Sequence, residues 1–370
     1  MGGAVRGAAV AELEIDLEAI AANYALLCER ARPAAVAAVV KADAYGLGLA
    51  PVATRLAAAG CRRFFVARLE EGVALRRLLH EAEIFLLDGV GSGEEEVLFA
   101  HRLIPVLNHP GELELWARYA RAVEQKLAAA LHIDTGMNRL GFAPEIARAL
   151  MPEQLEPLAL RLVMSHLACA EEPEHPLNAI QRERFTLATA GFDEVPRSLA
   201  ASSGIFLGAA YRFDLCRPGV ALYGVNPTPG RANPMQPVVR LTAPVLQVHE
   251  ITAPATVGYG ATYPVRPGMR VATVPVGYAD GLLRSASNRA TARIAGVDVP
   301  YAGRVSMDLT SLDVSALPGE AVVPGTRVEL IGGSDGVDRL AQQAGTIGYE
   351  VLTRLGRRFR RRYHGTRDPS

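Results

Sequence analysis

The sequence has few cysteines, no excess of charge and no long apolar run. Its 370 residues include only four cysteines, at widely separated positions: Cys28, Cys61, Cys169 and Cys216. None of them forms a CxxC pair, so we expect free thiols in a reducing cytoplasm and no metal site. Basic and acidic residues each number 39, which gives a formal net charge of zero. The overall charge therefore offers no case for a nucleic-acid or anionic-membrane partner.

Membrane and targeting signals are also missing. The apolar runs are too short to span a bilayer. The start of the chain, MGGAVRGAAVAELEIDL, reaches acidic residues before the apolar segment of a signal peptide is complete. We therefore expect a cytoplasmic protein. The basic end, RLGRRFRRRYHG, suggests a nucleic-acid patch when it is read alone, but the neutral balance elsewhere favours a solvated closing helix or strand.

Apolar residues nevertheless make up 49% of the chain, which is enough for a large core. An amphipathic helix capped by Asp16 is expected near the start. Short apolar runs then alternate with helical patterns, and eight of these runs are predicted strands: Val36–Val40, Arg63–Leu69, Glu83–Gly89, Leu103–Asn108, Lys126–Gly136, Leu158–Ala168, Arg197–Gly204 and Phe213–Gly224. Repeated β–α units of this size predict an α/β fold, a (β/α)8 TIM-type barrel. A doubly wound open sheet is the competing topology.

A proline- and glycine-rich segment, Asn226–Pro237, interrupts this alternation, and β-rich runs follow it. We therefore divide the chain into three parts. Residues 1–15 form an N-terminal strand that joins the C-terminal domain, residues 16–235 form the barrel, and residues 236–370 form a mostly β C-terminal domain. A last helical segment is expected over Val337–Leu355.

Lys41 directly follows the first buried strand of the predicted barrel, and Gly46 and Gly48 come shortly after it. An unpaired ammonium is costly in a core, and burial lowers its pKa. Such an amine is suited to form a Schiff base with an aldehyde cofactor. A lysine that snorkels to the surface is the alternative, and the local pattern does not separate the two. The stretch VVKADAYGLG, however, resembles the pyridoxal-phosphate (PLP) lysine motif of alanine racemases.

Further segments carry the same resemblance: HIDTGMNRLGF, MSHLACA, SLAASSG, RPGVALYG, VGYGATY, GYADG and GRVSMD. The resemblance implies a fold-type III, PLP-dependent isomerase that interconverts L-alanine and D-alanine, and hence a role in D-alanine biosynthesis for the peptidoglycan cell wall. It implies that Lys41 and Tyr259 act as acid/base groups on opposite faces of the substrate. It also implies a head-to-tail homodimer in which Tyr259 reaches Lys41 of the opposite chain. The alternatives are a racemase for serine or larger amino acids, a related barrel decarboxylase, and a non-catalytic PLP-binding barrel protein.

The resemblance also assigns the rest of the site. The expected cofactor contacts are Lys41, Tyr45, Arg139, His166, Ser202, Arg217, Gly219, Val220 and Tyr349. The expected contacts of the substrate carboxylate are Arg139 and Met307. The expected supporting and channel residues are Tyr278, Asp308, Arg304, Arg284, Glu171 and Ile347. Arg217 is expected to face the pyridine nitrogen, and because arginine does not give up its proton, the ring would be a weaker electron sink that disfavours transamination.

Three positions depart from the family's pattern. His132 stands where many members carry a carbamylated lysine, so an anion, a water or a direct contact is expected to take the place of that group. Ala201 and Ser198 stand where an asparagine and a histidine are common. From this we expect Arg217 to lack a supporting hydrogen bond.

Overall fold

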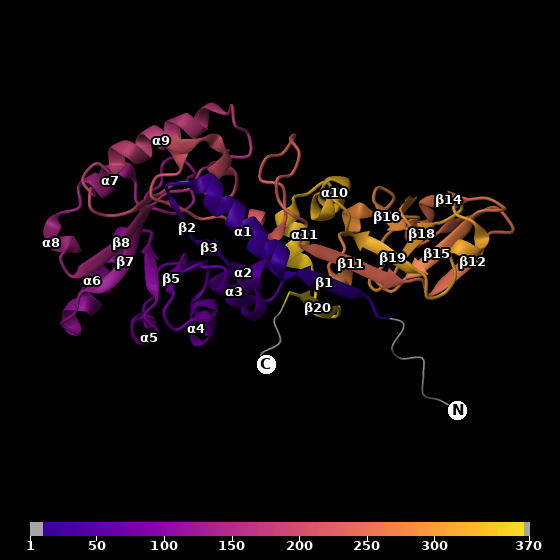
Figure 1. Cartoon of the computed structure of the whole chain (residues 1–370), viewed down its shortest axis with the longest axis horizontal. Helices are drawn as coiled ribbons and strands as arrows, with labels where there is room; N and C mark the ends of the chain where they lie inside the picture. The colour runs from indigo at the N-terminus through magenta and orange to yellow at the C-terminus, as the bar shows by residue number, and fades with distance from the viewer. Residues whose placement is uncertain (1–9, 366–370) are drawn as a thin grey trace.

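The structure, a computed structural model, describes residues 10–365. Residues 1–9, the first part of the segment examined for a signal peptide, lie outside the described residues. Figure 1 shows two lobes along the long axis of the molecule. One lobe holds the alternating helices and strands that follow β1, and the other is rich in β-structure. The linker after η3 (Val220–Tyr223) leads from the first lobe into the second.

The first lobe is a closed barrel of parallel strands. One sheet runs in the order β3 (Ala38–Val39), β4 (Arg63–Val66), β5 (Glu83–Leu86), β6 (Ile104–Leu107), β7 (Leu127–His132), β8 (Leu158–Met164) and β9 (Arg197–Ser198). β10 (Leu215–Cys216) pairs in parallel with β2 (Ala35–Val36), which runs on into β3.

Backbone hydrogen bonds close the ring between the first and last strands. The amide of Arg217 donates to the carbonyl oxygen of Ala200 at 2.9 Å, which joins the segment after β10 to the segment after β9. The amide of Val39 donates to the carbonyl oxygen of Pro218 at 3.0 Å, which joins β3 to the same segment. The eight-stranded barrel is thereby confirmed, and the open doubly wound sheet is excluded.

Helices cover the outside of the barrel. They are α1 (Leu17–Ala31), α3 (Leu49–Ala58), α4 (Leu69–Leu78), α5 (Glu95–Ala100), α6 (Pro110–Ala122), α7 (Pro144–Arg148), α8 (Pro152–Leu155) and α9 (Pro176–Ala188), with short 3-10 turns η1 (Ser203–Leu207) and η2 (Ala209–Tyr211). Asp16 caps α1 as expected, because its side chain accepts the amide of Ala19 at 2.9 Å. Leu69 begins α4, so the strand predicted to reach it is too long at its C-terminal end.

The second lobe is built on a six-stranded sheet in the order β17 (Val297–Pro300), β16 (Thr291–Ile294), β19 (Arg327–Ile331), β11 (Val239–Pro244), β1 (Glu12–Asp16) and β20 (Arg360–His364). A second sheet joins β12 (Gln247–Glu250), β15 (Arg270–Val274) and β18 (Thr310–Asp313), and β13 (Ala255–Val257) forms a hairpin with β14 (Tyr263–Val265). Short turns η4 (Tyr259–Ala261), η5 (Tyr278–Asp280), η6 (Arg284–Ala286) and η7 (Gly319–Ala321) connect them.

The last predicted helix is two helices, α10 (Gly336–Ala344) and α11 (Gly348–Arg354). Gly345 separates them with a φ of 73°, a left-handed conformation that ends a helix and that glycine adopts at little cost. The hydrophobic pattern continues across this break, which explains why the sequence predicts one segment.

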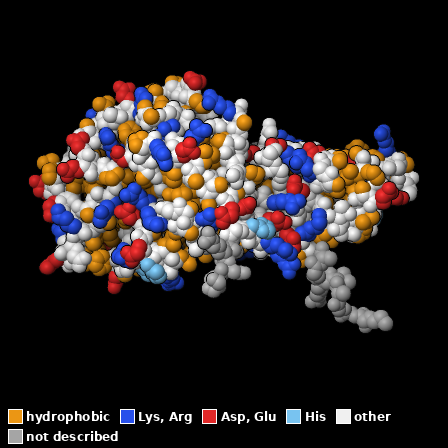
Figure 2. Space-filling model, viewed as in Figure 1, with side chains coloured by type: hydrophobic (Ala, Val, Ile, Leu, Met, Phe, Trp, Pro, Cys, Tyr) orange, Lys and Arg blue, Asp and Glu red, His pale blue; other side chains and the backbone are white. Residues whose placement is uncertain are grey.

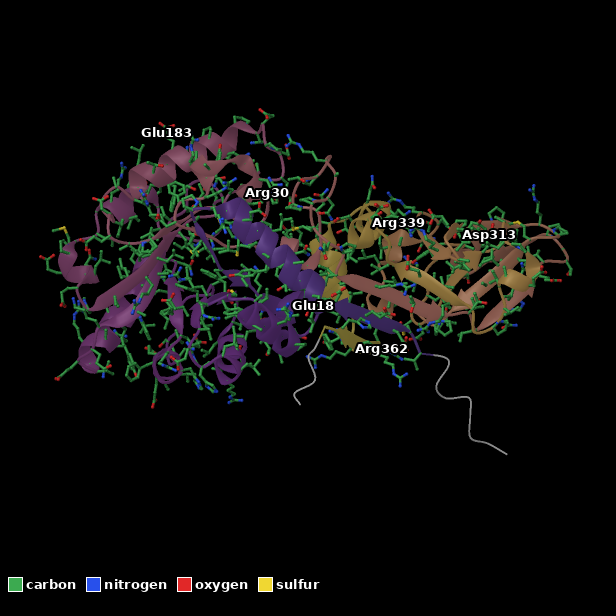
Figure 3. The ribbon with its side chains drawn as sticks, viewed as in Figure 1. Glu18, Arg30, Glu183, Asp313, Arg339 and Arg362 are labelled. Atoms are coloured by element: carbon green, nitrogen blue, oxygen red, sulfur yellow. The ribbon has the colours of Figure 1, made fainter. Side chains whose placement is uncertain are left out.

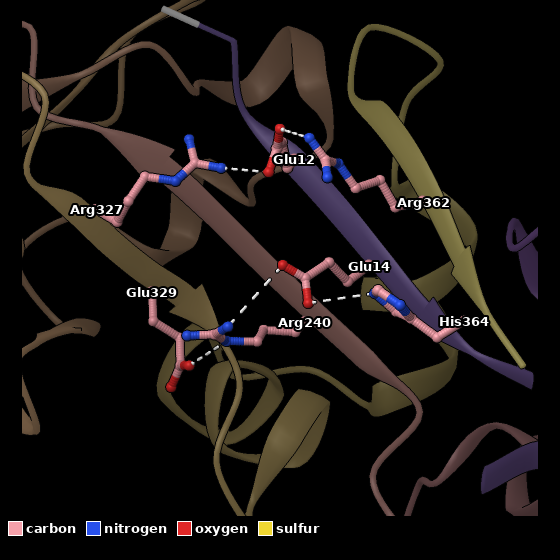
Figure 4. A network of polar contacts seen from close by, with 7 residues as sticks. All are labelled: Glu12, Glu14, Arg240, Arg327, Glu329, Arg362 and His364. Carbon is pink, nitrogen blue, oxygen red and sulfur yellow. Dashed lines mark hydrogen bonds and ion pairs between the residues drawn. The ribbon is translucent and has the colours of Figure 1, made fainter. Parts of the chain in front are cut away.

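β1 pairs antiparallel with β11 and parallel with β20, so segments from the two ends of the chain lie side by side. Glu12 on β1 forms ion pairs with Arg327 at 2.6 Å and with Arg362 at 2.9 Å, as Figure 4 shows. His364 lies 3.6 Å from Glu14 in the same network. Figure 2 shows basic and acidic side chains gathered together over this part of the surface. The basic end of the chain is therefore a strand whose outward side chains are balanced by acidic neighbours.

Candidate active site

Lys41 stands just after β3, where the chain turns with left-handed geometry. It begins the short helical element α2 (Lys41–Tyr45), and the strand predicted over Val36–Val40 ends one residue early, at Val39. Ala42, Asp43, Ala44 and Tyr45 have φ values of 55°, 55°, 54° and 56°. For residues other than glycine this conformation costs about 1–2 kcal/mol each. The turn therefore requires support from its surroundings.

Two acidic side chains support this turn from within the barrel lobe. The amide of Ala42 donates to Oε1 of Glu71 at 2.6 Å. The amide of Leu49 donates to Oδ1 of Asp43 at 2.7 Å, which fixes the start of α3 against the turn. Glu71 also accepts the amide of Ala67 at 2.9 Å and so ties the lysine turn to the start of α4.

The surroundings of Lys41 favour a neutral amine. Burial lowers the pKa of Lys41, and the positive charge of Arg139 lowers it further. The carboxylates of Asp88 and Glu71 act in the opposite direction. A lowered pKa increases the unprotonated, nucleophilic fraction of the amine at a given pH, which favours the reactive interpretation over the snorkelling one.

The loop after β7 carries Arg139 back towards Lys41. Asp134 shapes this loop, because its Oδ1 accepts the amides of Gly136 at 2.9 Å, Met137 at 2.9 Å and Asn138 at 3.1 Å. The charge of Arg139 lowers the pKa of His132 and His166 as well as that of Lys41. These four side chains therefore share one region at the C-terminal ends of the barrel strands.

Arg217 is buried, with 4% of its surface exposed. Its guanidinium donates to the hydroxyl of Ser198 and, at 2.6 Å, to the carbonyl oxygen of Ser165. The expectation that Arg217 lacks a supporting hydrogen bond is therefore wrong. Ser198 supplies that bond because β9 and β10 are neighbours in the barrel. Burial lowers the pKa of Arg217 to about 10, which still leaves it charged at neutral pH.

His132 is buried and contacts Asn108, which follows the neighbouring strand β6. Nδ1 of His132 lies 2.9 Å from Oδ1 of Asn108. The amide nitrogen of Asn108 donates to the carbonyl oxygens of Val106 at 2.8 Å and Leu87 at 3.2 Å, so Oδ1 is the atom left to accept. Burial and the charge of Arg217 lower the pKa of His132 to about 4. The neutral ring thus donates from Nδ1 to Asn108 and keeps Nε2 as an acceptor.

His166, in the loop after β8, is also neutral at physiological pH. Burial, followed by the charges of Arg217 and Arg139, lowers its pKa to about 3. Its backbone carbonyl accepts Nε2 of Gln181 at 2.9 Å, which fixes the segment against α9. Both histidines are therefore uncharged beside a group of cationic side chains.

Ser202, Gly219 and Tyr45 meet at a second group near η3. The hydroxyl of Ser202 accepts the amides of Gly219 at 3.1 Å and Ala221 at 3.2 Å. A Cβ atom at Gly219 would lie 2.2 Å from Oη of Tyr45, so only glycine fits there. The ring centroids of Tyr45 and Tyr349 are 6.2 Å apart, and Tyr349 donates to Glu171 at 3.5 Å. Hydroxyl and backbone N–H groups of this kind suit the phosphate of a cofactor attached at Lys41.

Val220, another predicted cofactor contact, is buried at the start of η3. The other predicted residues lie in the C-terminal domain. Tyr259 is 70% exposed, and Met307 is 54% exposed. A Cβ atom at Gly260 would lie 2.7 Å from the guanidinium of Arg304, so Arg304 packs against the Tyr259 turn. The amide of Ala279, next to Tyr278, donates to the carbonyl oxygen of Met307 at 2.9 Å. These contacts join the residues after β13, β15 and β17 into one exposed group.

Two further predicted residues belong to the same group. Asp308 lies in the loop before β18 and forms an ion pair with Arg358 at 2.8 Å. Arg284 begins η6, and its carbonyl oxygen accepts the hydroxyl of Ser287 at 2.5 Å. Ile347 differs from both, because it precedes α11 close to the barrel, and 56% of its surface is exposed.

The predicted site is thus divided within one chain. Figure 1 places α2 in the barrel lobe and β14 at the far end of the other lobe. Tyr263 of β14, close to Tyr259, donates to Asp313 at 2.9 Å, and Figure 3 shows Asp313 in that distant region. The structure therefore gathers Lys41 and its neighbours in one place and the Tyr259 group in another.

Sequence reasoning missed several residues of the barrel group, namely Glu71, Asn108, Ser165 and Tyr223. Tyr223 packs against Tyr45 with ring centroids 4.7 Å apart and ring planes tilted by 34°, and it donates to the carbonyl oxygen of Val39 at 2.9 Å. Asn108 could have been found, because it is the last residue of a predicted strand next to that of His132.

Family models now decide between the alternatives. The model described as "Alanine racemase, N-terminal domain" matches residues 15–227, and "Alanine racemase, C-terminal domain" matches residues 238–363. The chain belongs to the alanine racemase family.

Individual proteins agree with the family models. The chain is 51% identical to the alanine racemase of Rhodospirillum rubrum over 98% of both chains. It is 47% identical to a catabolic alanine racemase of Agrobacterium fabrum, over 96% of this chain and 93% of that protein. The crystal structure of the alanine racemase from Bartonella henselae, with covalently bound pyridoxal phosphate, superposes with a TM-score of 0.92 at 38% identity, covering 96% of this chain and 99% of that one.

Two further findings concern membrane spans and metal sites among the described residues. Between residues 10 and 365, no helix is long and apolar enough to cross a membrane. In the same part of the chain, no three His, Cys, Asp or Glu side chains are placed to hold a metal ion together.

Proposed function

We propose that this alanine racemase interconverts L-alanine and D-alanine with PLP bound at Lys41, and that Lys41 and Tyr259 move the Cα proton on opposite faces of the substrate. The observation that carries this proposal is a partly buried amine of lowered pKa, at the start of a left-handed turn, beside a phosphate-type cradle. When bound, PLP withdraws electrons from the amino acid and so makes the Cα proton easier to remove.

The donor set of the chain fits this cofactor. Lys41 supplies the amine, and the Ser202, Gly219 and Tyr45 group supplies hydroxyl and N–H donors for a phosphate. Arg139 and Met307 are proposed to bind the substrate carboxylate, with Arg139 offering a fixed positive charge. In this proposal His166 packs beside the cofactor as a neutral ring.

Arg217 sets the proposed electronic character of the site. It is buried and charged, and its donors to Ser198 and Ser165 hold it in place. If Arg217 faces the pyridine nitrogen of bound PLP, a cation that keeps its proton would leave that nitrogen unprotonated, so PLP would be a weaker electron sink and transamination would be disfavoured.

Tyr259 is proposed to complete the active site of a second copy of the chain, where it would face the substrate from the side opposite Lys41. Its 70% exposure supports a shared site over one within a single chain, as does its place between β13 and β14, because β14 lies at the far end of the C-terminal domain in Figure 1. Tyr278, Arg284, Arg304 and Asp308 would then line the access channel together with Glu171 and Ile347. Closed twofold symmetry accounts for two such sites in one homodimer.

Alanine is the proposed substrate, and the proposed role is D-alanine supply to peptidoglycan in the cytoplasm. The four cysteines are free, which suits a reducing compartment. Agrobacterium fabrum has relatives named both catabolic, at 47% identity, and biosynthetic, at 43%. Requirement of a deletion strain for added D-alanine would support the biosynthetic role, and growth without it would contradict that role.

The reaction is tested with purified protein. Racemisation of alanine, serine and lysine is measured side by side, and alanine should be the fastest substrate. Lys41→Ala should lose the absorbance band of covalently bound PLP, and a band that persists would place the cofactor on another lysine. Conversion of serine or lysine as fast as alanine would favour the broader-specificity alternative.

The shared site is tested by mixing two inactive variants. Lys41→Ala and Tyr259→Phe chains, refolded together, should regain up to about half of the activity per mixed dimer, because one of its two sites is intact. No recovery in mixed dimers of verified composition would contradict the assignment of Tyr259 to the opposite chain.

A further inference from the structure

The turn that carries Lys41 ends against the C-terminal domain of the same chain. Its last residues, Gly46 to Gly48, lie under α11 and β20. A Cβ atom at Gly46 would lie 2.7 Å from the carbonyl oxygen of Leu352 in α11. A Cβ atom at Gly48 would lie 2.4 Å from Oη of Tyr363 in β20. The two glycines therefore serve close contact between the domains as well as turn geometry.

Two side chains of β20 hold this contact. Nη1 of Arg361 donates to the carbonyl oxygen of Gly46 at 2.7 Å, and its Nη2 donates to the carbonyl oxygen of Leu355 at 3.3 Å. Oη of Tyr363 donates to the carbonyl oxygen of Leu47 at 2.9 Å. Arg361 and Tyr363 point to one face of the strand, because side chains alternate, while Arg362 points to the other face and pairs with Glu12 at 2.9 Å.

We propose that Arg361 and Tyr363 are positioning residues for Lys41. Four successive residues in the left-handed region form a strained segment, and such segments persist only where neighbours hold them. Glu71 and Asp43 hold the first part of the turn from the barrel. Arg361 and Tyr363 hold the end of the turn. Two backbone hydrogen bonds connect this end to the residues next to the lysine. The amide of Gly46 donates to the carbonyl oxygen of Ala42 at 2.7 Å, and the amide of Gly48 donates to that of Asp43 at 2.8 Å.

The C-terminal domain then has two tasks in one dimer. It presents Tyr259 to the opposite chain, which rests on the proposed function, and it fixes Lys41 of its own chain. The second task depends only on contacts within one chain. Loss of Arg361 or Tyr363 should therefore loosen the lysine turn even in a protein that shows no racemase activity.

The test compares Arg361→Met and Tyr363→Phe with Arg362→Met, a matched control on the opposite face of the same strand. Hydrogen exchange of residues 42–49 is measured by mass spectrometry on the PLP-bound protein, and release of PLP is followed by absorbance. Arg361→Met removes a hydrogen bond that a charged group donates to Gly46. Hydrogen exchange in this segment should therefore rise about tenfold or more in that variant. Tyr363→Phe should raise it less, because a neutral hydrogen bond is weaker.

Further readouts separate positioning from general stability. In the two test variants PLP should dissociate several-fold faster, and kcat for alanine should fall more than KM rises. Arg361→Lys should restore part of both properties, since it can still donate to Gly46. The proposal would be overturned if exchange in this segment were the same in Arg361→Met and Tyr363→Phe as in the unmodified protein. It would also be overturned if Arg362→Met raised exchange as much as the two test variants do. If Arg361→Met does not fold, Tyr363→Phe, which keeps the packed ring, tests the proposal by the same criteria.

Discussion

The neutral state of His132 predicts a loss of stability in mild acid. Burial, followed by the charge of Arg217, lowers the pKa of this side chain from 6.5 to about 4 in the folded protein. The unfolded chain therefore binds a proton at a higher pH than the folded chain does. Stability that depends on the neutral ring is fully present above pH 6.5 and is lost as the pH falls towards 4.

The magnitude follows from these two values. With pKa values of 6.5 unfolded and about 4 folded, the linkage relation gives a loss of about 2 kcal/mol in the free energy of unfolding between pH 7.5 and pH 5. His166 acts in the same direction, because its pKa is lowered to about 3. His132 is 8% exposed, so solvent screening reduces this contribution only slightly.

The assay is urea unfolding of the PLP-bound protein and of His132→Asn at several pH values between 7.5 and 5. Asparagine can still bond to Asn108 but does not titrate in this range. The unmodified protein should lose about 2 kcal/mol more than His132→Asn across this interval. Parallel stability curves for the two proteins would refute the reasoning. A nuclear magnetic resonance titration in which His132 protonates near pH 6.5 would refute it directly.

Substitutions at three other positions test separate parts of the structure. Arg217→Glu should increase the pyruvate formed per racemisation turnover, because an acidic partner favours a protonated ring nitrogen; unchanged pyruvate would contradict the electron-sink argument. Arg76→Met should lower the free energy of unfolding by about 3 kcal/mol, because five hydrogen bonds from the buried guanidinium to carbonyl oxygens are lost. These bonds lie at the barrel end opposite Lys41, so kcat should not change. Denaturant unfolding measures the loss of stability, and a fall in kcat would contradict the prediction. Ala42→Gly should stabilise the lysine turn by about 1 kcal/mol, seen as a higher melting temperature, whereas Ala42→Val should lower it.

The barrel could be predicted from the sequence because each strand is a short apolar run between turn residues. Phe64, Phe65 and Val66 are fully buried and come from one such run. The C-terminal limits were less accurate, since an apolar residue such as Leu69 continues the strand pattern although it begins a helix. The boundaries of the three domains remain predictions.

The pairings inside the site were harder to foresee. The left-handed turn has no sequence signal at Ala42 or Ala44, because glycine comes only at Gly46. The Ser198 hydroxyl at Arg217 was missed for a different reason. Comparison with the family's usual residues drew attention to a missing asparagine and histidine, whereas barrel order alone places Ser198 on β9 beside Arg217 after β10.

The two buried histidines, His132 and His166, lie beside basic side chains that disfavour their protonation. Lys41, Arg139 and Arg217 bring three basic groups to the C-terminal end of the barrel, and each charge on a histidine would add repulsion in a region of low dielectric. Keeping His132 and His166 neutral avoids that repulsion and leaves the ring nitrogens available as hydrogen-bond acceptors or donors. The positive charges of Arg139 and Arg217 favour an anionic cofactor and an amino-acid carboxylate. The charge of Arg139, which acts together with the larger effect of burial to lower the pKa of Lys41, therefore also attracts the molecules with which Lys41 is proposed to react.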